Sequence, residues 1–219
     1  MFSDKKRLLV LIGLAVLLVV VYVAVQGVPG MGGSPSVDVD EDDSAAAPPS
    51  GTNVVTPVPP AVAVRRREVK ARRREVFRMA VQKKPEYLPK LKKAAVDPEW
   101  KVRHAAVDGV GRLGREGDPQ FLIGVLSNRN EQAEVRAAAA ERLGDMRFWD
   151  AGPAIIDAME DSSAMLRARA GVALRRIVVV DMGFRANDPL DRRNKAMKKI
   201  RELWPWFYEK FAHRDEAKG

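Results

Sequence analysis

The sequence predicts an all-helical protein, an α-solenoid of about three to four helix pairs, and the first observation behind this prediction is a repeated segment. It occurs at residues 102–111, 135–144 and 166–175, and each copy begins with an apolar residue and Arg and has Ala three positions after the Arg. Successive Arg residues are 33 and 31 positions apart. A fixed period in the low thirties with two helical segments per unit is typical of repeats that stack into a solenoid.

Signals for helix ends are the second observation. Pro119 and Pro153 suit the first turn of the helices between the repeated segments, where no amide hydrogen bond is lost. A residue suited to an N-cap stands six positions before each repeated Arg, and these residues are Asp97, Asn130 and Asp161. The helix pairs are therefore expected at 86–95 with 99–113, 119–126 with 131–146, and 153–160 with 162–180.

The segment 8–28 is expected to be a transmembrane helix. It contains an uncharged run of 18 residues from Leu8 to Val25, which is about 27 Å long as a helix and crosses a bilayer core when extended to Val28. A cleaved signal peptide is the alternative, because three cations precede the run, but the run is longer than the usual apolar region of such a peptide.

The flanking charges predict an orientation for this segment. Residues 1–7 carry three Lys and Arg, and the next basic residue after the segment is Arg65. The positive-inside rule then places the N-terminus in the cytoplasm and the rest of a single-pass cell-membrane protein on the extracytoplasmic side. Residues 29–62 hold seven of the 14 prolines and an acidic cluster at 38–43, a composition expected to give a disordered linker.

Residues 63–219 are expected to form the repeat domain, which begins with a strongly basic helix at about 65–82. Between residues 65 and 93 there are 13 Lys and Arg against 3 Glu. The dipeptide at 69–70 lies 33 positions before the one at 102–103, so we interpret the helix as a degenerate first repeat that covers the end of the array. The apolar residues expected to pack are Val69, Val76, Phe77, Ala80 and Val81.

The pattern Val-Arg-x-x-Ala-x-x-x-Leu-Gly, preceded by Asp or Asn, resembles HEAT repeats. It is most similar to the short HEAT-like repeats of phycobilisome lyases, and the resemblance covers about residues 65–180. Bilin transfer does not follow from it, because a repeat match reports architecture and not activity.

The resemblance implies a ladder of Asp and Arg side chains between adjacent helices. In this sequence the ladder would consist of Asp97, Arg103, Asn130, Arg136, Asp161 and Arg167. A row of phosphate-binding Arg is the functional alternative, and the structural role is favoured.

A last helix is expected from near Pro189, and Pro205 is expected to kink or end it. Around this proline lies an aromatic run that contains Trp204 and Trp206. The favoured interpretation is that the run covers the last repeat, and the alternative is an exposed binding anchor, since Trp dominates binding hot spots.

The sequence contains no catalytic constellation. There is no Cys, which excludes disulfides, thiolate metal sites and thiol nucleophiles, and the two histidines are His104 and His213. No Gly-rich phosphate loop and no His pair with metal-ligand spacing occur. We therefore expect no enzymatic activity, no cofactor and no metal.

These observations favour a membrane-anchored scaffold that docks a protein partner without catalysis. The candidate partner-binding residues are Arg65, Arg66, Arg67, Arg72, Arg73, Arg74, Trp204 and Trp206. The alternative is binding of nucleic acid or anionic lipid through residues 65–93. The extracytoplasmic location and the lack of aromatic residues among the cations argue against nucleic acid.

Overall fold

The computed structural model describes residues 59–212, and over this range the chain is helical and contains no strand. The all-helical prediction is confirmed for these residues. The helices are α2 (Pro60–Gln82), α3 (Leu88–Ala94), α4 (Trp100–Arg112), α5 (Pro119–Ser127), α6 (Ala133–Asp145), α7 (Gly152–Ala158), α8 (Ala164–Val178) and α9 (Leu190–Phe211). Short 3-10 turns lead into or out of several of them.

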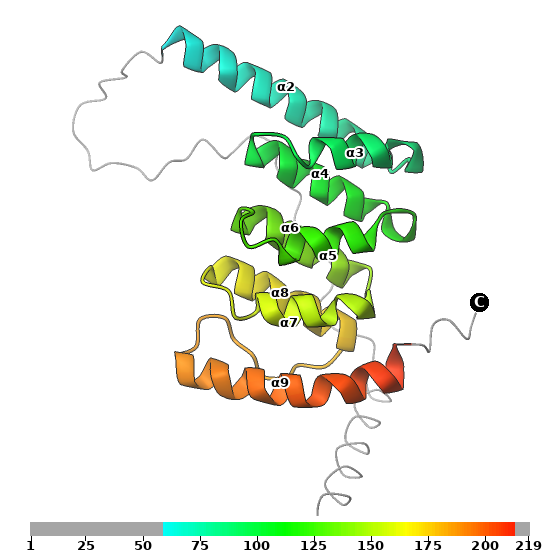
Figure 1. Ribbon diagram of the computed structural model, residues 1–219, viewed down its shortest axis with the longest axis vertical. Coiled ribbons are helices and arrows are strands. Elements are labelled where there is room, and N and C mark those ends of the chain that lie inside the picture. Colours follow the sequence, from blue (N-terminus) through cyan, green and yellow to red (C-terminus); the bar gives the residue numbers. More distant parts are fainter. Residues whose placement is uncertain (1–58, 213–219) are drawn as a thin grey trace, which may run out of the picture. The chain divides into compact units, whose positions relative to one another are not determined.

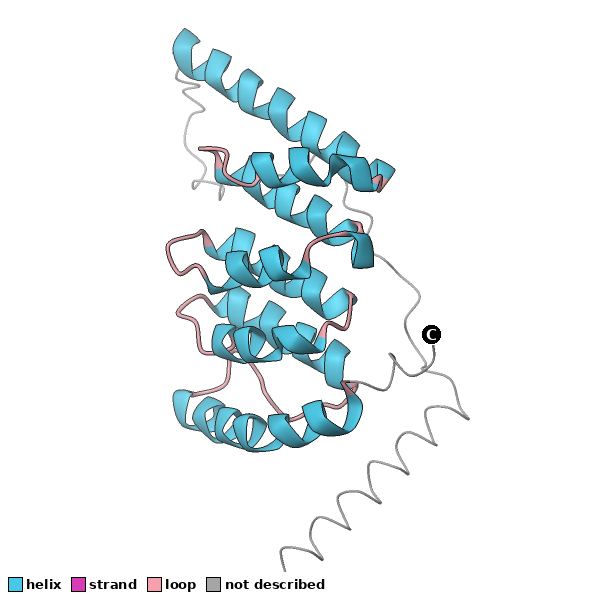
Figure 2. Cartoon of the chain, turned by 45° about the vertical axis from the view of Figure 1, so that its right-hand side comes forward, coloured by secondary structure: helices cyan, strands magenta, loops and turns pink. Residues whose placement is uncertain are grey.

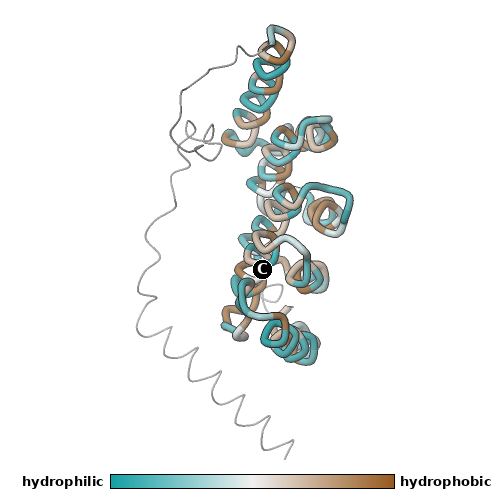
Figure 3. The backbone as a smooth tube through the Cα atoms, turned by 90° about the vertical axis from the view of Figure 1, so that its left-hand side faces the viewer, coloured by the Kyte–Doolittle hydropathy of each residue, from teal (hydrophilic) through white to brown (hydrophobic). Residues whose placement is uncertain are grey.

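The helices form two layers that follow the order of the chain (Figure 1). Helices α2, α4, α6 and α8 pack on one another in sequence and make up the even-numbered layer. Helices α3, α5 and α7 each pack against the even-numbered helix that follows, and α9 packs against α7. Figure 2 shows the helix pairs stacked along the long axis, and Figure 3 shows the two layers as two columns of helices seen nearly end-on.

Small residues let neighbouring helices of the even-numbered layer approach closely. A Cβ atom added at Gly144 in α6 would lie 2.6 Å from the Cα atom of Ala173 in α8. One added at Gly111 in α4 would lie 2.3 Å from the Cβ atom of Arg142. The glycine that ends the repeated pattern therefore sits at a helix crossing where no side chain fits.

The predicted N-caps are wrong by two residues. The helices that follow Asp97, Asn130 and Asp161 begin after Glu99, Gln132 and Ser163. Before α4 and α8 the physical reason is a turn: a carboxylate oxygen of Asp97 accepts from the amide of Glu99 at 2.8 Å, and one of Asp161 accepts from the amide of Ser163 at 2.8 Å. Before α6 the acceptor of such a turn is Asn128, which accepts from the amide of Asn130 at 3.1 Å.

Helix α9 does not end at Pro205. It continues to Phe211, and Pro205 lies on its exposed side between the buried residues Trp204 and Phe207. Proline has no amide hydrogen to donate to the preceding turn. Because Pro205 lies on the solvent side, water can donate to the backbone carbonyl oxygen that is left without this bond.

Within residues 59–212, no helix is long and apolar enough to cross a membrane. The predicted span at 8–28, all but the last residues of the predicted linker at 29–62, and His213 lie outside the described residues. The predicted linker extended to residue 62, whereas α2 begins at Pro60.

Candidate interaction surface

A row of Arg side chains connects each helix pair to the next. Nε of Arg72 donates to Asp97 at 2.8 Å, Nη2 of Arg103 to Glu131 at 2.7 Å, and Nη1 of Arg136 to Asp161 at 2.7 Å. Arg167 continues the row by donating to the carbonyl oxygen of Ala186 at 3.2 Å and 3.1 Å. We call these four Arg residues and their acceptors the inter-repeat ladder.

Each of the three later Arg residues also binds its own helix pair. Arg103 donates to the carbonyl oxygen of Asp97 at 2.8 Å, and Arg167 donates to that of Asp161 at 2.8 Å. Arg136 donates to the carbonyl oxygen of Leu126 at 2.9 Å and is 7% exposed. A guanidinium presents several donors in one plane, which is why Arg can tie two segments together.

The ladder differs from the one that the family resemblance implied. Arg103 pairs with Glu131, so Asn130 is not its partner, and Arg72 is an additional member. Burial acts to raise the pKa of Asp161, but the amide of Ser163 and the guanidinium of Arg136 outweigh it, and the pKa lies below its usual range. The pKa of Glu131 is likewise lowered by Arg103 against the effect of burial.

A second row of ion pairs crosses the outer face of the even-numbered layer, near the helix C-termini. Its members alternate in charge along the row, with two on α4, two on α6 and one on α8: Arg112, Asp108, Arg142, Asp145 and Arg176. Sequence reasoning did not find this row. The signal was present, because positions 112, 145 and 176 each lie nine residues after a repeated Arg and carry charges of alternating sign.

Helix α2 contributes nothing to this second row, and most of its cations have no ion-pair partner among the described residues. Of its eight Lys and Arg, Arg72 alone forms an ion pair or side-chain hydrogen bond within residues 59–212. The other seven are Arg65, Arg66, Arg67, Lys70, Arg73, Arg74 and Arg78, and all are exposed. Arg72 was predicted to bind a partner, and its place in the ladder makes it a structural residue.

Most of the exposed cations of α2 lie in two rows, and the exposed Glu68 and Glu75 lie outside both. Val76 and Ala80 are buried against the stack. The side of the helix opposite to them carries what we call the outer row: Val64, Arg67, Ala71, Arg74 and Arg78, spaced by three and four residues. About a quarter-turn away, what we call the side row consists of Arg66, Lys70, Arg73, Phe77 and Val81.

The charge of the side row acts on α4, the helix on which α2 packs. Burial lowers the pKa of His104 in α4, and the positive charge of Arg73 lowers it further. Phe77 and Val81, which were predicted to pack, are 42% and 53% exposed. The row thus combines cations with an exposed aromatic ring.

No family model and no curated protein matches the chain. The surface must therefore be interpreted from its own chemistry.

The aromatic run at the other end of the stack is packed against α7. Trp204 is 8% exposed, and a Cβ atom added at Gly152 would lie 1.9 Å from its ring. Its ring centre lies 5.7 Å from that of Trp149. Trp206 is half-buried, with its ring edge-on to those of Phe207 and Phe211. The burial of Trp204 excludes it as an exposed anchor.

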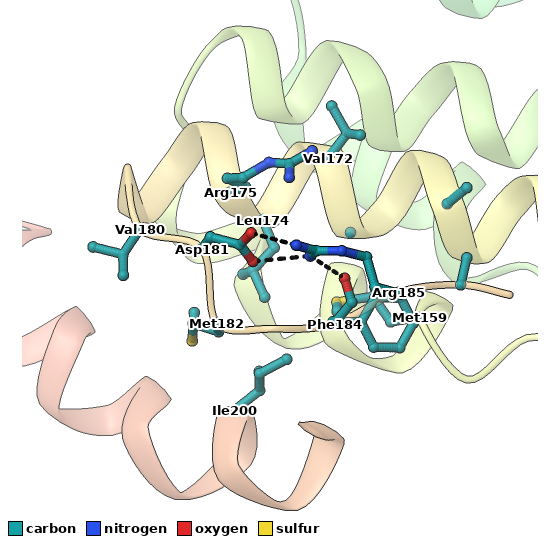
Figure 4. Close-up of a pocket in the computed structure, with 13 residues that line it drawn as sticks. Met159, Val172, Leu174, Arg175, Val180, Asp181, Met182, Phe184, Arg185 and Ile200 are labelled. Atoms are coloured by element: carbon teal, nitrogen blue, oxygen red, sulfur yellow. Dashed lines mark hydrogen bonds and ion pairs between the residues drawn. The ribbon is translucent and has the colours of Figure 1, made fainter. Parts of the chain in front are cut away.

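A small cavity of about 180 Å³ lies where α8, residues 180–186 and α9 meet (Figure 4). Asp181 and Arg185 form an ion pair of 2.9 Å at its rim. Hydrogen bonds from Arg185 and from the amide of Gly183 lower the pKa of Asp181 to about 2. The cavity is smaller than typical small-molecule sites, and we assign no ligand to it.

Proposed function

We propose that this chain is a membrane-anchored scaffold, a HEAT-like α-solenoid that docks a protein partner on α2 and has no catalytic role. The solenoid is supported by the inter-repeat ladder, because its Arg residues recur at intervals of 31, 33 and 31 positions and connect successive helix pairs. The anchor is supported by the apolar run at 8–25 in the sequence.

The observation that carries the docking role is the contrast between the cations of α2 and the second row of ion pairs on α4, α6 and α8. On the outer face of α4, α6 and α8, Arg112, Arg142 and Arg176 are neutralised by carboxylates. On α2, seven cations lack such a partner among residues 59–212. Arg and exposed aromatic residues are enriched at protein interfaces, so the side row around Phe77 has the composition of a docking site for an acidic protein surface.

The side row also has α4 beside it. Because α2 packs on α4 and the charge of Arg73 acts on His104 of α4, a partner bound at this row would lie close to α4 as well. A docking surface that continues from one repeat to the next is the usual way in which solenoids bind proteins.

Site-specific photo-crosslinking of the full chain in its native membrane tests this proposal. A photoreactive phenylalanine analogue replaces Phe77, and a control chain carries it at the exposed Lys199 of α9. We expect a discrete adduct from position 77, none from position 199, and loss of the adduct in Lys70→Glu/Arg73→Glu. The matched control is Arg192→Glu/Lys195→Glu on α9, which should leave the adduct unchanged. Equal adducts from both positions, or an adduct insensitive to charge reversal on α2, would contradict the docking role.

A further inference from the structure

The outer row of α2 lies on a convex ridge at one end of the stack. Helix α2 begins the even-numbered layer, with α3 and α4 on one side of it (Figure 1). The outer row lies opposite Val76 and Ala80, which are buried against the stack. The row runs from Val64 to Arg78, about 21 Å along the helix axis. Every member of the row is exposed, so the ridge is accessible along its whole length.

Positive charge is concentrated in α2 and α3, at this end of the stack. The stretch from residue 65 to residue 93 holds 13 Lys and Arg against 3 Glu, whereas the other 25 Lys and Arg of the chain are matched by 26 Asp and Glu. Within the outer row, Arg67, Arg74 and Arg78 have no ion-pair partner in residues 59–212. Residues 65–93 are therefore strongly basic, and the rest of the sequence is approximately neutral.

The shape and composition of the outer row favour a flat anionic surface as its occupant. Protein segments dock mostly into grooves or along sheet edges, whereas a bare convex helix meets a planar surface along its full length. Single-stranded nucleic acid is bound on aromatic side chains that stack with the bases, and the outer row contains none. Guanidinium groups hold phosphate oxygens through paired hydrogen bonds, and phosphate is the charged group of anionic lipid headgroups.

We propose that the outer row binds the anionic headgroups of a lipid bilayer, and that this contact leaves the side row available to a protein partner. The apolar members of the outer row, Val64 and Ala71, are too small to anchor the helix in the acyl region. Binding is therefore electrostatic, and the helix lies on the headgroups without inserting. This inference rests on the proposed function, because it needs a bilayer to which the same chain is anchored. The segment expected at 8–28 would provide that anchor.

The absence of Cys allows a direct test with the full chain. Ala71→Cys in the outer row carries an environment-sensitive fluorophore, and the chain is reconstituted into vesicles whose lipids bear a quencher on the headgroup. In vesicles with about one-third phosphatidylglycerol at low salt we expect strong quenching, which should be lost in purely zwitterionic vesicles and at high salt. The control label is Lys199→Cys on α9, which should show weak quenching in both lipids.

Charge variants separate this proposal from its alternatives. The substitutions Arg67→Gln, Arg74→Gln and Arg78→Gln, made together in the Ala71→Cys chain, should weaken the contact on the order of 100-fold, since each cation near an anionic surface contributes about a fivefold factor. Arg192→Gln, Lys195→Gln and Lys198→Gln on α9 remove the same charge and should change nothing. Quenching that does not depend on lipid charge, or that survives the outer-row substitutions, would overturn the proposal. Binding of polyglutamate to the outer row at concentrations at which anionic vesicles do not bind would also overturn it.

Failure of the proposed anchor gives a different result. Without an anchor the full chain would not float with zwitterionic vesicles, yet added anionic vesicles would still carry it and quench the label at position 71. Flotation with both lipids but no quenching with either would retain the anchor and refute the headgroup contact.

Discussion

Replacing Arg136 by Met is the most direct test of the inter-repeat ladder. The side chain is 7% exposed and joins three segments: its own helix α6, the end of α5 through the carbonyl oxygen of Leu126 at 2.9 Å, and the turn before α8 through Asp161 at 2.7 Å. Methionine fills a similar volume but donates no hydrogen bond, so the substitution removes the polar contacts and little of the packing.

The expected loss of stability can be worked out from these contacts. An orphaned buried carbonyl oxygen costs about 1–3 kcal/mol. Removing one partner of a fully buried ion pair costs about 3–5 kcal/mol, but Asp161 is 15% exposed and still accepts from the amide of Ser163. We therefore expect the free energy of unfolding to fall by about 3 kcal/mol in total, less than the sum of about 4–8 kcal/mol that these two costs would give at full burial.

Urea denaturation of the full chain in detergent micelles, followed by circular dichroism, measures this change. The matched control is Arg169→Met, because Arg169 pairs with Glu141 at 3.1 Å but is 55% exposed. That pair should contribute about 0–1 kcal/mol. A double-mutant cycle with Asp161→Asn should give a coupling energy of about 1–3 kcal/mol. If Arg136→Met destabilises the protein no more than Arg169→Met, or if the cycle shows no coupling, the ladder does not hold the repeats together.

Two further predictions concern the C-terminal half and the interior of the array. Gly152→Ala should destabilise the protein by about 1–3 kcal/mol and alter the Trp emission spectrum, because a Cβ atom there would lie 1.9 Å from the ring of Trp204. Gly124→Ala should stabilise the protein by about 0.5–1 kcal/mol, because a Cβ atom at that position would have no other atom within 4 Å. In an NMR titration the carboxyl group of Asp181 should titrate at about 2, below its ordinary value of 3.8, because Arg185 and the amide of Gly183 donate to it. Because folding lowers the pKa of Asp181, its ion pair with Arg185 stabilises the folded state above pH 3.8, and this stabilisation is lost as the pH falls toward 2. The two side chains are 46% and 56% exposed, so the stabilisation is at most about 1 kcal/mol. Arg185→Gln should raise the titration midpoint toward 3.8, and an unchanged midpoint would refute this account.

The period of the sequence predicted the helices and three of the four ladder Arg residues, because the repeat fixes which positions recur. It predicted two of the acidic partners, Asp97 and Asp161, but named Asn130 where Glu131 is the acceptor. The ladder runs from one helix pair to the next, and the acceptor is whichever carboxylate the connecting turn brings within reach. In two turns that residue is Asp97 or Asp161, but before α6 the turn presents Glu131.

The register of the first repeat shows why a degenerate unit is harder to align. An offset of 33 residues placed Lys70 at the ladder position, but an offset of 31, which also occurs between Arg136 and Arg167, selects Arg72. The same offset pairs Val76 with Val107, and both are buried. In a helix with cations on most sides, charge alone could not distinguish the two registers.

The exposure of Phe77 and Val81 could not be predicted for a related reason. Both have helical spacing from buried residues, and a pattern of apolar residues does not reveal that one side of the helix has no neighbour. Likewise, the aromatic run suggested either a cover for the last repeat or an exposed anchor, and only the position of Trp204 against Gly152 distinguishes them.

The corrected register also explains why α2 has an exposed basic side. Arg78 of α2 corresponds to Gly109 of α4, where a Cβ atom would come within 3.0 Å of the Cβ atom of Ala80. Ala71 corresponds to Val102, which is 1% exposed in the core. In α4, then, the position of Gly109 lacks a side chain where the preceding helix packs, and the position of Val102 carries an apolar side chain in the core. In α2 they carry a long cation and a small residue, which do not allow another helix pair to pack in the same way. The outer row is thus unsuited to extending the stack and suited to an anionic partner that a guanidinium can reach from the end of its side chain.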